Sequence, residues 1–340
     1  MLTMLLCLSS WTFSPAQENG DVKELLDKVK QLEGQVQDLR EEADVRNKLK
    51  ITREEEQQKE EEILTAVDRE EYTLTKKKSI NLTYSLGYSY SSYDKLQLDE
   101  SDIFGEHLYN HSIDHKISVS YGILNNLSVS FGIPFKYRYY QTGGNESRDV
   151  TDIGDMSLGV GFRPFKSAGW MPTISFNGSA TLPTGRSPYK IDPNTELSTG
   201  GGLYSVGAGI SMSKPIDPIV AFGSLSYSYK FPKSDFTQNV NGLILEKVEP
   251  GPSLGFKLGV AYALSYRTSI NLSFNYTHGF SSTYYYKGGF ARETAVGTSA
   301  GFSVGTGWKI SPKTTISLGV GIGLVGDENF SLSFSVPFEF

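Results

Sequence analysis

Apolar and polar positions follow two different rhythms along this chain. Between residues 21 and 43 apolar side chains recur at alternating steps of three and four, the a and d pattern of an α-helical coiled coil. These positions are Val22, Leu25, Val29, Leu32, Val36, Leu39 and Ala43, and Leu64, Val67 and Leu74 resume the frame after a glutamate-rich middle. The pattern predicts a coiled-coil arm over residues 17–78 that self-associates or docks on a partner. A solvated charged helix that only spaces the following domain is the alternative.

From Ile80 onward the period falls to two, so each segment has one apolar face and one face of small polar residues. This alternation predicts about twelve β-strands. They cover residues 80–91, 113–123, 129–139, 156–165, 171–182, 204–212, 219–231, 254–264, 270–280, 296–310, 316–324 and 330–340. In the seventh, Val220 and Phe222 are out of step with Leu225 and Tyr227, which predicts a β-bulge.

The connections between these strands alternate in length. Short turns are predicted at residues 125–126, 166–169, 215–218, 265–268 and 311–314. Longer polar loops are predicted at residues 94–112, 141–152, 183–202, 232–251 and 281–294, with a brief one at 326–329. Short turns on one side and long loops on the other are typical of outer-membrane barrels. We therefore expect residues 79–340 to form an all-β transmembrane barrel of antiparallel strands, preceded by the helical arm.

The residue types on the two faces favour a membrane barrel over a soluble sandwich. The polar face consists mainly of Ser, Thr, Gly and Asn, which suits a water-filled lumen, whereas the outer faces of a soluble sandwich carry charge. The apolar face has aromatic residues near strand ends, as in the interfacial girdles of barrels. These are Tyr137, Tyr139, Tyr227, Tyr229, Tyr276 and Trp308. The chain ends on Phe338 and Phe340, a terminal pattern expected to be read by the barrel-assembly machinery, unless the aromatic end is a coincidence.

Charge and cysteine content place further limits on function. Of the formal net charge of −6, the arm accounts for most, since residues 18–78 hold 18 acidic and 13 basic side chains. No basic face remains for a nucleic acid. Residues 1–16 have the apolar run and small-residue end of a signal peptide. They contain the only cysteine, Cys7, so cleavage would leave no thiol chemistry, and lipid attachment at Cys7 is the alternative.

Two short motifs resemble a known family. Residues 152–159 read DIGDMSLG, Phe162-Arg163-Pro164 follows, and residues 182–186 read LPTGR. Both resemble the outer-membrane family named for the meta-pathway of phenol degradation, although Thr151 and Asp152 stand where that family usually has Gly and a small residue. The resemblance covers residues 80–340 and leaves out the arm. It implies a channel or transporter for small molecules, without fixing a substrate.

The same motifs supply the candidate site residues. A turn near residue 168 would pair Asp155 with Thr181, and Asp155, Thr184 and Arg186 would then form a polar rim at the outer mouth. The alternative is a conformational device in which Gly and Pro shape a tight rim. Strand parity also points cations into the lumen and predicts a narrow, weakly anion-preferring pore. The lumen candidates are Lys116, Lys136, Arg138, Arg163, Lys257 and Lys309, with Glu339 as a carboxylate.

No catalytic residue, cofactor or metal site is predicted. His107, His111 and His115 step by four, but they are expected to straddle a loop and a strand start. Residues 200–202 are three glycines without a phosphate-binding context. The predicted function is passive passage of small molecules through the outer membrane, with the arm in the periplasm. The predicted partners are outer-membrane lipid, the assembly machinery and a second copy of the chain. The alternative function is a structural anchor whose barrel only fixes the arm.

Overall fold

The computed structural model describes residues 28, 30–33, 35–37, 72–98, 103–142, 146–165, 171–216, 219–240, 242–265, 267–311, 314–326 and 329–340. The chain divides into two units, Met1–Glu56 and Gln57–Phe340. The described residues of the first unit are helical and exposed, and they include Leu32 and Val36 of the apolar stripe. The rest of the predicted coiled coil up to residue 71, and the whole predicted signal peptide, lie outside the described residues. The arm therefore stays a prediction.

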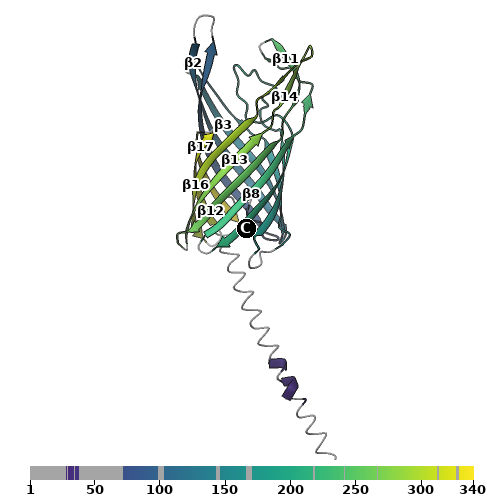
Figure 1. The fold of residues 1–340 in the computed structure, drawn as a ribbon, viewed down its shortest axis with the longest axis vertical. Coiled ribbons are helices and arrows are strands. Elements are labelled where there is room, and N and C mark those ends of the chain that lie inside the picture. The colour runs from purple at the N-terminus through teal and green to yellow at the C-terminus, as the bar shows by residue number, and fades with distance from the viewer. Residues whose placement is uncertain are drawn as a thin grey trace, which may run out of the picture. The chain divides into compact units, whose positions relative to one another are not determined.

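The second unit contains a closed antiparallel β-barrel (Figure 1). One sheet holds thirteen strands, and β4 and β5 are two halves of one interrupted strand, so twelve strands of the described chain form the wall. They are β1 Ile80–Leu98, β2 Ile103–Leu124, β3 Leu127–Thr142, β4 Ser147–Ile153 with β5 Met156–Phe162, β6 Thr173–Leu182, β7 Ser205–Ile216, β8 Ile219–Lys230, β12 Ser253–Ala263, β13 Thr268–Gly279, β16 Gly297–Ser311, β17 Thr314–Val325 and β18 Phe330–Glu339. The predicted strand number is confirmed.

The barrel closes where the first strand meets the last. β1 pairs with β18 from Asn81↔Glu339 to Tyr90↔Phe330. The chain end extends this seam, since the Phe340 N–H donates to the Ile80 carbonyl at 2.9 Å. Closure leaves the wall without an unpaired edge, which hydrocarbon could not solvate.

Side chains alternate across the wall as the period of two predicts. Val119, Phe131 and Leu258 are exposed on the outer surface, whereas Ser118 and Ser211 are buried on the inner one. Among the described residues no helix is long and apolar enough to cross a membrane. An apolar outer face around a polar interior is the arrangement that a transmembrane barrel requires.

The predicted loop at residues 94–112 is wrong. β1 and β2 continue to pair as far as Leu98↔Ile103, so most of this segment is a long hairpin that rises beyond the rest of the wall (Figure 1). Backbone hydrogen bonds hold such a hairpin without the apolar alternation that a lipid-facing strand needs. The sequence pattern therefore carried no signal for it.

A second small sheet forms from two other predicted loops. It contains β9 Lys233–Ser234, β10 Asn239–Val240, β11 Leu243–Glu249, β14 Thr283–Tyr286 and β15 Phe290–Glu293. Its core buries Leu203, Phe236, Leu245 and Val248. The predicted loops at residues 232–251 and 281–294 are therefore folded around an apolar core of their own.

Candidate functional site

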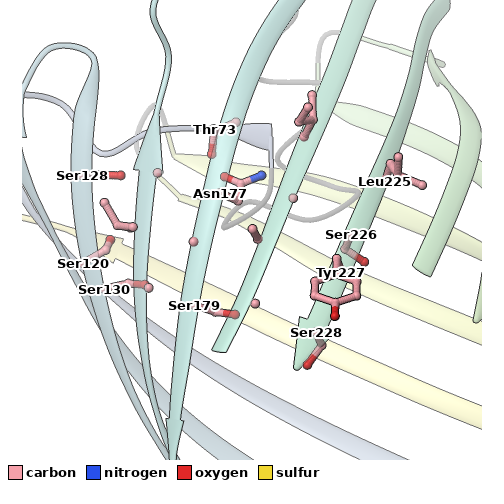
Figure 2. Close-up of a pocket in the computed structure, with 18 of the residues that line it drawn as sticks. Thr73, Ser120, Ser128, Ser130, Asn177, Ser179, Leu225, Ser226, Tyr227 and Ser228 are labelled. Atoms are coloured by element: carbon pink, nitrogen blue, oxygen red, sulfur yellow. The ribbon is translucent and has the colours of Figure 1, made fainter. Parts of the chain in front are cut away.

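The barrel contains a cavity of about 400 Å³ that is lined mainly by Ser, Thr, Asn and Gly. Hydroxyl groups from several strands line it, and Figure 2 shows the labelled serines spread over strands that lie side by side in the wall. They include Ser120, Ser128, Ser130, Ser179, Ser226 and Ser228. None of the described residues that line the cavity is charged at neutral pH. The cavity can hold water and small polar solutes, but it offers no nucleophile–base pair or metal-ligand set.

Glycines opposite the serines keep this space open. A Cβ at Gly159 would lie 2.4 Å from Ser130 Oγ, and one at Gly207 would lie 2.6 Å from Ser179 Oγ. Real Cβ atoms do not approach oxygen so closely, so a larger residue would push the serine away. The Ser and Gly residues that the sequence predicts to line the lumen are therefore also required for packing.

The chain segment of residues 72–79 lies across one mouth of the barrel. We call this end, where the short turns and both barrel termini lie, the inner mouth. Tyr72 is only 3% exposed and packs on Val220, Phe222 and Ala261. Its ring meets Phe222 edge-on at a centroid distance of 5.3 Å. Farther along, Thr75 Oγ1 lies 2.7 Å from Ser120 Oγ, so the segment is held by polar as well as apolar contacts.

Two predicted pore cations hold this segment. Arg163 Nη2 donates to the Tyr72 carbonyl at 2.8 Å, and Lys257 Nζ lies 5.8 Å from the centroid of the Tyr72 ring. The second distance is typical of a cation–π contact. Both side chains point into the barrel as predicted, but they stabilise the segment that narrows the inner mouth.

The predicted bulge at Val220 and Phe222 is wrong. β8 pairs with β7 and with β12 in unbroken register across both residues. Their side chains are out of step with Leu225 because they face the interior, where they form the apolar seat of Tyr72. The irregular pattern of β8 therefore results from its contact with Tyr72 and not from a β-bulge.

At the opposite end, the outer mouth, the interrupted strand forms a bulge. Phe135 pairs with Ile153 and Gly132 pairs with Ser157, so the β4–β5 strand has one extra residue opposite Pro134. The Gly154 N–H donates to the Pro134 carbonyl at 2.7 Å. Pro134 has no backbone N–H to donate to the neighbouring strand, so the ladder of hydrogen bonds is interrupted at this residue.

The predicted pairing of Asp155 with Thr181 is wrong by two positions, because Ser157 pairs with Thr181. The turn between β5 and β6 is centred later than residue 168, and this displaces the register. Asp155 instead receives two backbone hydrogen bonds from the loop after β6. Gly185 N–H donates to Oδ1 at 3.0 Å, and Gly201 N–H donates to Oδ2 at 2.6 Å.

Thr184 and Arg186 complete this arrangement. The Thr184 hydroxyl accepts from Met156 N–H at 3.0 Å and donates to the Gly154 carbonyl at 2.9 Å. Arg186 forms an ion pair with Glu196. The three predicted rim residues therefore do lie together, and Asp155 and Thr184 bind mainly to backbone groups. This geometry favours the conformational alternative at the rim.

Lys136 and Arg138 lie on the inner face of β3, and Lys136 lies beside the rim, because a Cβ at Gly154 would be 2.9 Å from its Cε. In the register, Lys136 stands opposite Asp114 on one side and Asp152 on the other. The alternation along β2 could have predicted that Asp114 faces the lumen, because it lies two residues before Lys116. It could not have predicted the same for Asp152, because the bulge shifts the alternation of β4. Arg163 and Lys257 thus lie at the inner mouth, whereas Asp155, Thr184 and Arg186 lie at the outer rim with Lys136 beside them, so the predicted residues do not form one site.

His111, His115 and the terminal phenylalanines face outward. His115 Nδ1 lies 2.8 Å from Tyr84 Oη, and His111 Nδ1 lies 2.9 Å from Tyr88 Oη. Phe338 and Phe340 are exposed. In the described part of the chain no three His, Cys, Asp or Glu side chains gather as a metal site. The expectation that His107 to His115 straddle a loop and a strand is wrong, since all three residues belong to β2.

Comparisons with known proteins agree with this geometry. The family named for the MetA-pathway of phenol degradation matches residues 108–338, well over half of the chain. The COG4313 outer membrane channel from Pseudomonas putida F1 has a similar structure, with a TM-score of 0.59 at 16% identity over 79% of this chain and 97% of that one. The transport unit of the autotransporter AIDA-I from Escherichia coli has a TM-score of 0.46 at 12% identity, over 82% of this chain and 97% of that one. The CymD monoaromatic hydrocarbon channel has a TM-score of 0.39 at 12% identity, over 78% of this chain and 89% of that one. The first likeness shows the fold of an outer-membrane barrel, and the other two are too weak to support an argument.

Proposed function

The chain belongs to the family named for the MetA-pathway of phenol degradation, and from this premise we propose that it is an outer-membrane channel for passive passage of small molecules. The observation that carries the proposal is the hydroxyl-lined cavity inside a barrel whose outer surface is apolar. A barrel that served only as an anchor would have no need for a polar interior kept open by paired Gly and Ser. The family name makes small aromatic compounds the first solutes to test.

The proposed pore is narrow and only weakly selective for anions. Arg163 and Lys257 face the interior but contact Tyr72. Lys136 lies between Asp114 and Asp152 in the register, so its field is partly cancelled. The remaining excess of lumen cations favours anions, and the neutral Ser and Gly wall adds no preference of its own.

Planar-bilayer recording on the full-length protein tests the proposal. We expect small single-channel steps and a reversal potential that shifts modestly toward the anion potential in a salt gradient. Liposome swelling with phenol, benzoate and arabinose then measures which solutes pass. A folded, inserted barrel that neither conducts nor supports swelling by any of the three would refute the channel.

The second candidate, a structural anchor, rests on the apolar stripe of the arm. Leu32 and Val36 are exposed on the described helix, so a partner or a second copy could cover them. We infer that the arm oligomerises or docks in the periplasm. Deletion of residues 21–71 separates the two functions, since a channel still conducts without the arm, whereas an anchor loses its attachment. Light scattering of both forms reports whether the arm sets the oligomeric state.

A further inference from the structure

A second cavity of about 400 Å³ lies among the outer loops. The loop after β6 forms one side of it, and Lys233 of β9 contributes to another. Its polar lining comprises Arg186, Ser187, Lys190, Glu196 and Lys233, and none of these residues lines the lumen cavity. It is therefore a separate site, with a volume near the lower end of the roughly 300 to 1,000 Å³ that small-molecule sites occupy.

The charge of this lining is positive. Glu196 is its one carboxylate, and both of its oxygens are engaged, Oε1 with Arg186 and Oε2 with the Asp192 N–H at 3.1 Å. Lys190 and Lys233 have no carboxylate oxygen within 4.0 Å in the described chain. The ammonium groups of Lys190 and Lys233 can therefore interact with a ligand in the cavity.

The walls that carry these lysines are held in place by the protein itself. Gln238 Nε2 donates to the carbonyls of Pro188 at 2.7 Å and Ile191 at 2.5 Å, on either side of Lys190. The ring of Phe236 joins the two sides, because Lys233 Nζ lies 5.6 Å from its centroid and the Tyr189 ring lies 4.9 Å from it. The backbone beside Lys190 and the side chain of Lys233 are therefore in place before a ligand arrives, which lowers the entropy lost on binding.

A neutral group at this site also suits an anion. Ser187 Oγ accepts from the Tyr189 N–H at 3.3 Å, which leaves its hydroxyl proton to donate.

We propose that this cavity binds a compact oxyanion, a carboxylate or a phosphate, through Lys190, Lys233 and the Ser187 hydroxyl. Ammonium and hydroxyl donors are the groups that form charge-assisted hydrogen bonds with such ligands. The site goes beyond the proposed channel, because binding does not require the lumen to conduct. If both hold, the cavity raises the anion concentration at the outer mouth.

Isothermal titration of the full-length protein in detergent tests the proposal with benzoate, inorganic phosphate and benzamide. Benzamide has the shape of benzoate without its charge. We expect benzoate or phosphate to bind and benzamide not to bind. In the double variant Lys190→Gln/Lys233→Gln the apparent Kd should rise by about tenfold or more, as the loss of charge-assisted bonds predicts. Lys287→Gln is the matched control, because Lys287 lies in an exposed turn of the same sheet outside the cavity.

Binding of only one of the two anions narrows the ligand class and supports the site. Three results would overturn it: no binding of either anion, equal binding of benzamide and benzoate, or an unchanged Kd in the double variant. Gel mobility before and after heating shows that each variant barrel is folded. Loss of conductance with intact anion binding would instead count against the channel alone.

Discussion

The two mouths of the barrel use their cations in opposite ways. At the inner mouth Arg163 and Lys257 contact the chain's own Tyr72, and the opening is narrowed. At the outer mouth Lys190 and Lys233 line an open cavity and have no carboxylate partner in the described chain. The difference teaches that a positive residue near a pore says little about selectivity until its contacts are known. Four changes would break or sharpen this contrast, and they follow from the largest expected effect to the smallest.

Tyr72→Ala should have the largest effect, because it removes the ring that anchors the segment across the inner mouth. Truncation of a buried aromatic side chain costs about 3 kcal/mol or more, which favours the released segment more than a hundredfold. We expect the single-channel conductance to rise severalfold. Tyr93→Ala, an exposed tyrosine of β1, is the control and should leave conductance unchanged. An unaltered conductance in Tyr72→Ala would mean that the segment does not limit flow.

A disulfide should hold the same segment in place. Thr75 Oγ1 and Ser120 Oγ are 2.7 Å apart, so Thr75→Cys/Ser120→Cys places two thiols within bonding reach. Cys7 is the only native cysteine, which keeps the pairing simple. We expect the oxidised protein to conduct no more than wild type and to lose any larger openings. Reduction should restore them, so each sample is its own control.

Asp155→Asn should loosen the outer rim and leave ion selectivity unchanged. The amide can accept through one atom only, so one of the N–H groups of Gly185 and Gly201 loses its partner. Such a loss costs about 1 to 3 kcal/mol, and the two amides should exchange hydrogen about tenfold to a hundredfold faster. The control is Asp149→Asn, since Asp149 is an exposed residue of β4. A clear change of reversal potential in Asp155→Asn alone would restore Asp155 as a selectivity residue.

Acidification should produce the smallest effect, and only outside the barrel wall. Hydrogen bonds from Lys247 and then from Tyr285 lower the pKa of Glu249 below its ordinary 4.5. A carboxyl group with a depressed pKa contributes stability above its unfolded-state pKa and loses it as the pH falls through the folded-state value. The pKa of Lys247 is raised above 10.5, first by the hydrogen bond to Glu249, so the pair persists at neutral pH.

Hydrogen exchange at pH 5 and pH 3 measures this change. We expect β11 and β14 to lose a little protection at pH 3, because the group is exposed and screened by solvent. The apolar packing of Tyr72 on Phe222 should not respond. Equal loss of protection at the inner mouth would show that the two ends are not independent. Lys247→Gln should abolish the pH response of the small sheet.

The sequence did not predict the role of residues whose contacts lie far away in the chain. Val220 and Phe222 looked like a bulge because their partner, Tyr72, lies about 150 positions earlier in a segment with no strand pattern. Asp155 was placed near the correct neighbours, but the register was two residues off because turn residues 166–169 carry no periodic signal. Lys190 and Lys233 were missed for the same reason, since one belongs to a long loop and the other to a two-residue strand.

The period of two past Ile80 determined by itself that this chain builds a closed wall with an apolar outside and a polar inside. Strand parity is a local property, so within an unbroken strand it fixes which side of the wall a residue faces. Only the tertiary structure decided that the lumen cations Arg163 and Lys257 contact Tyr72 and that the loop residues Lys190 and Lys233 line a cavity. That outcome depends on register and on the packing of loops, which bring together residues that no local pattern connects.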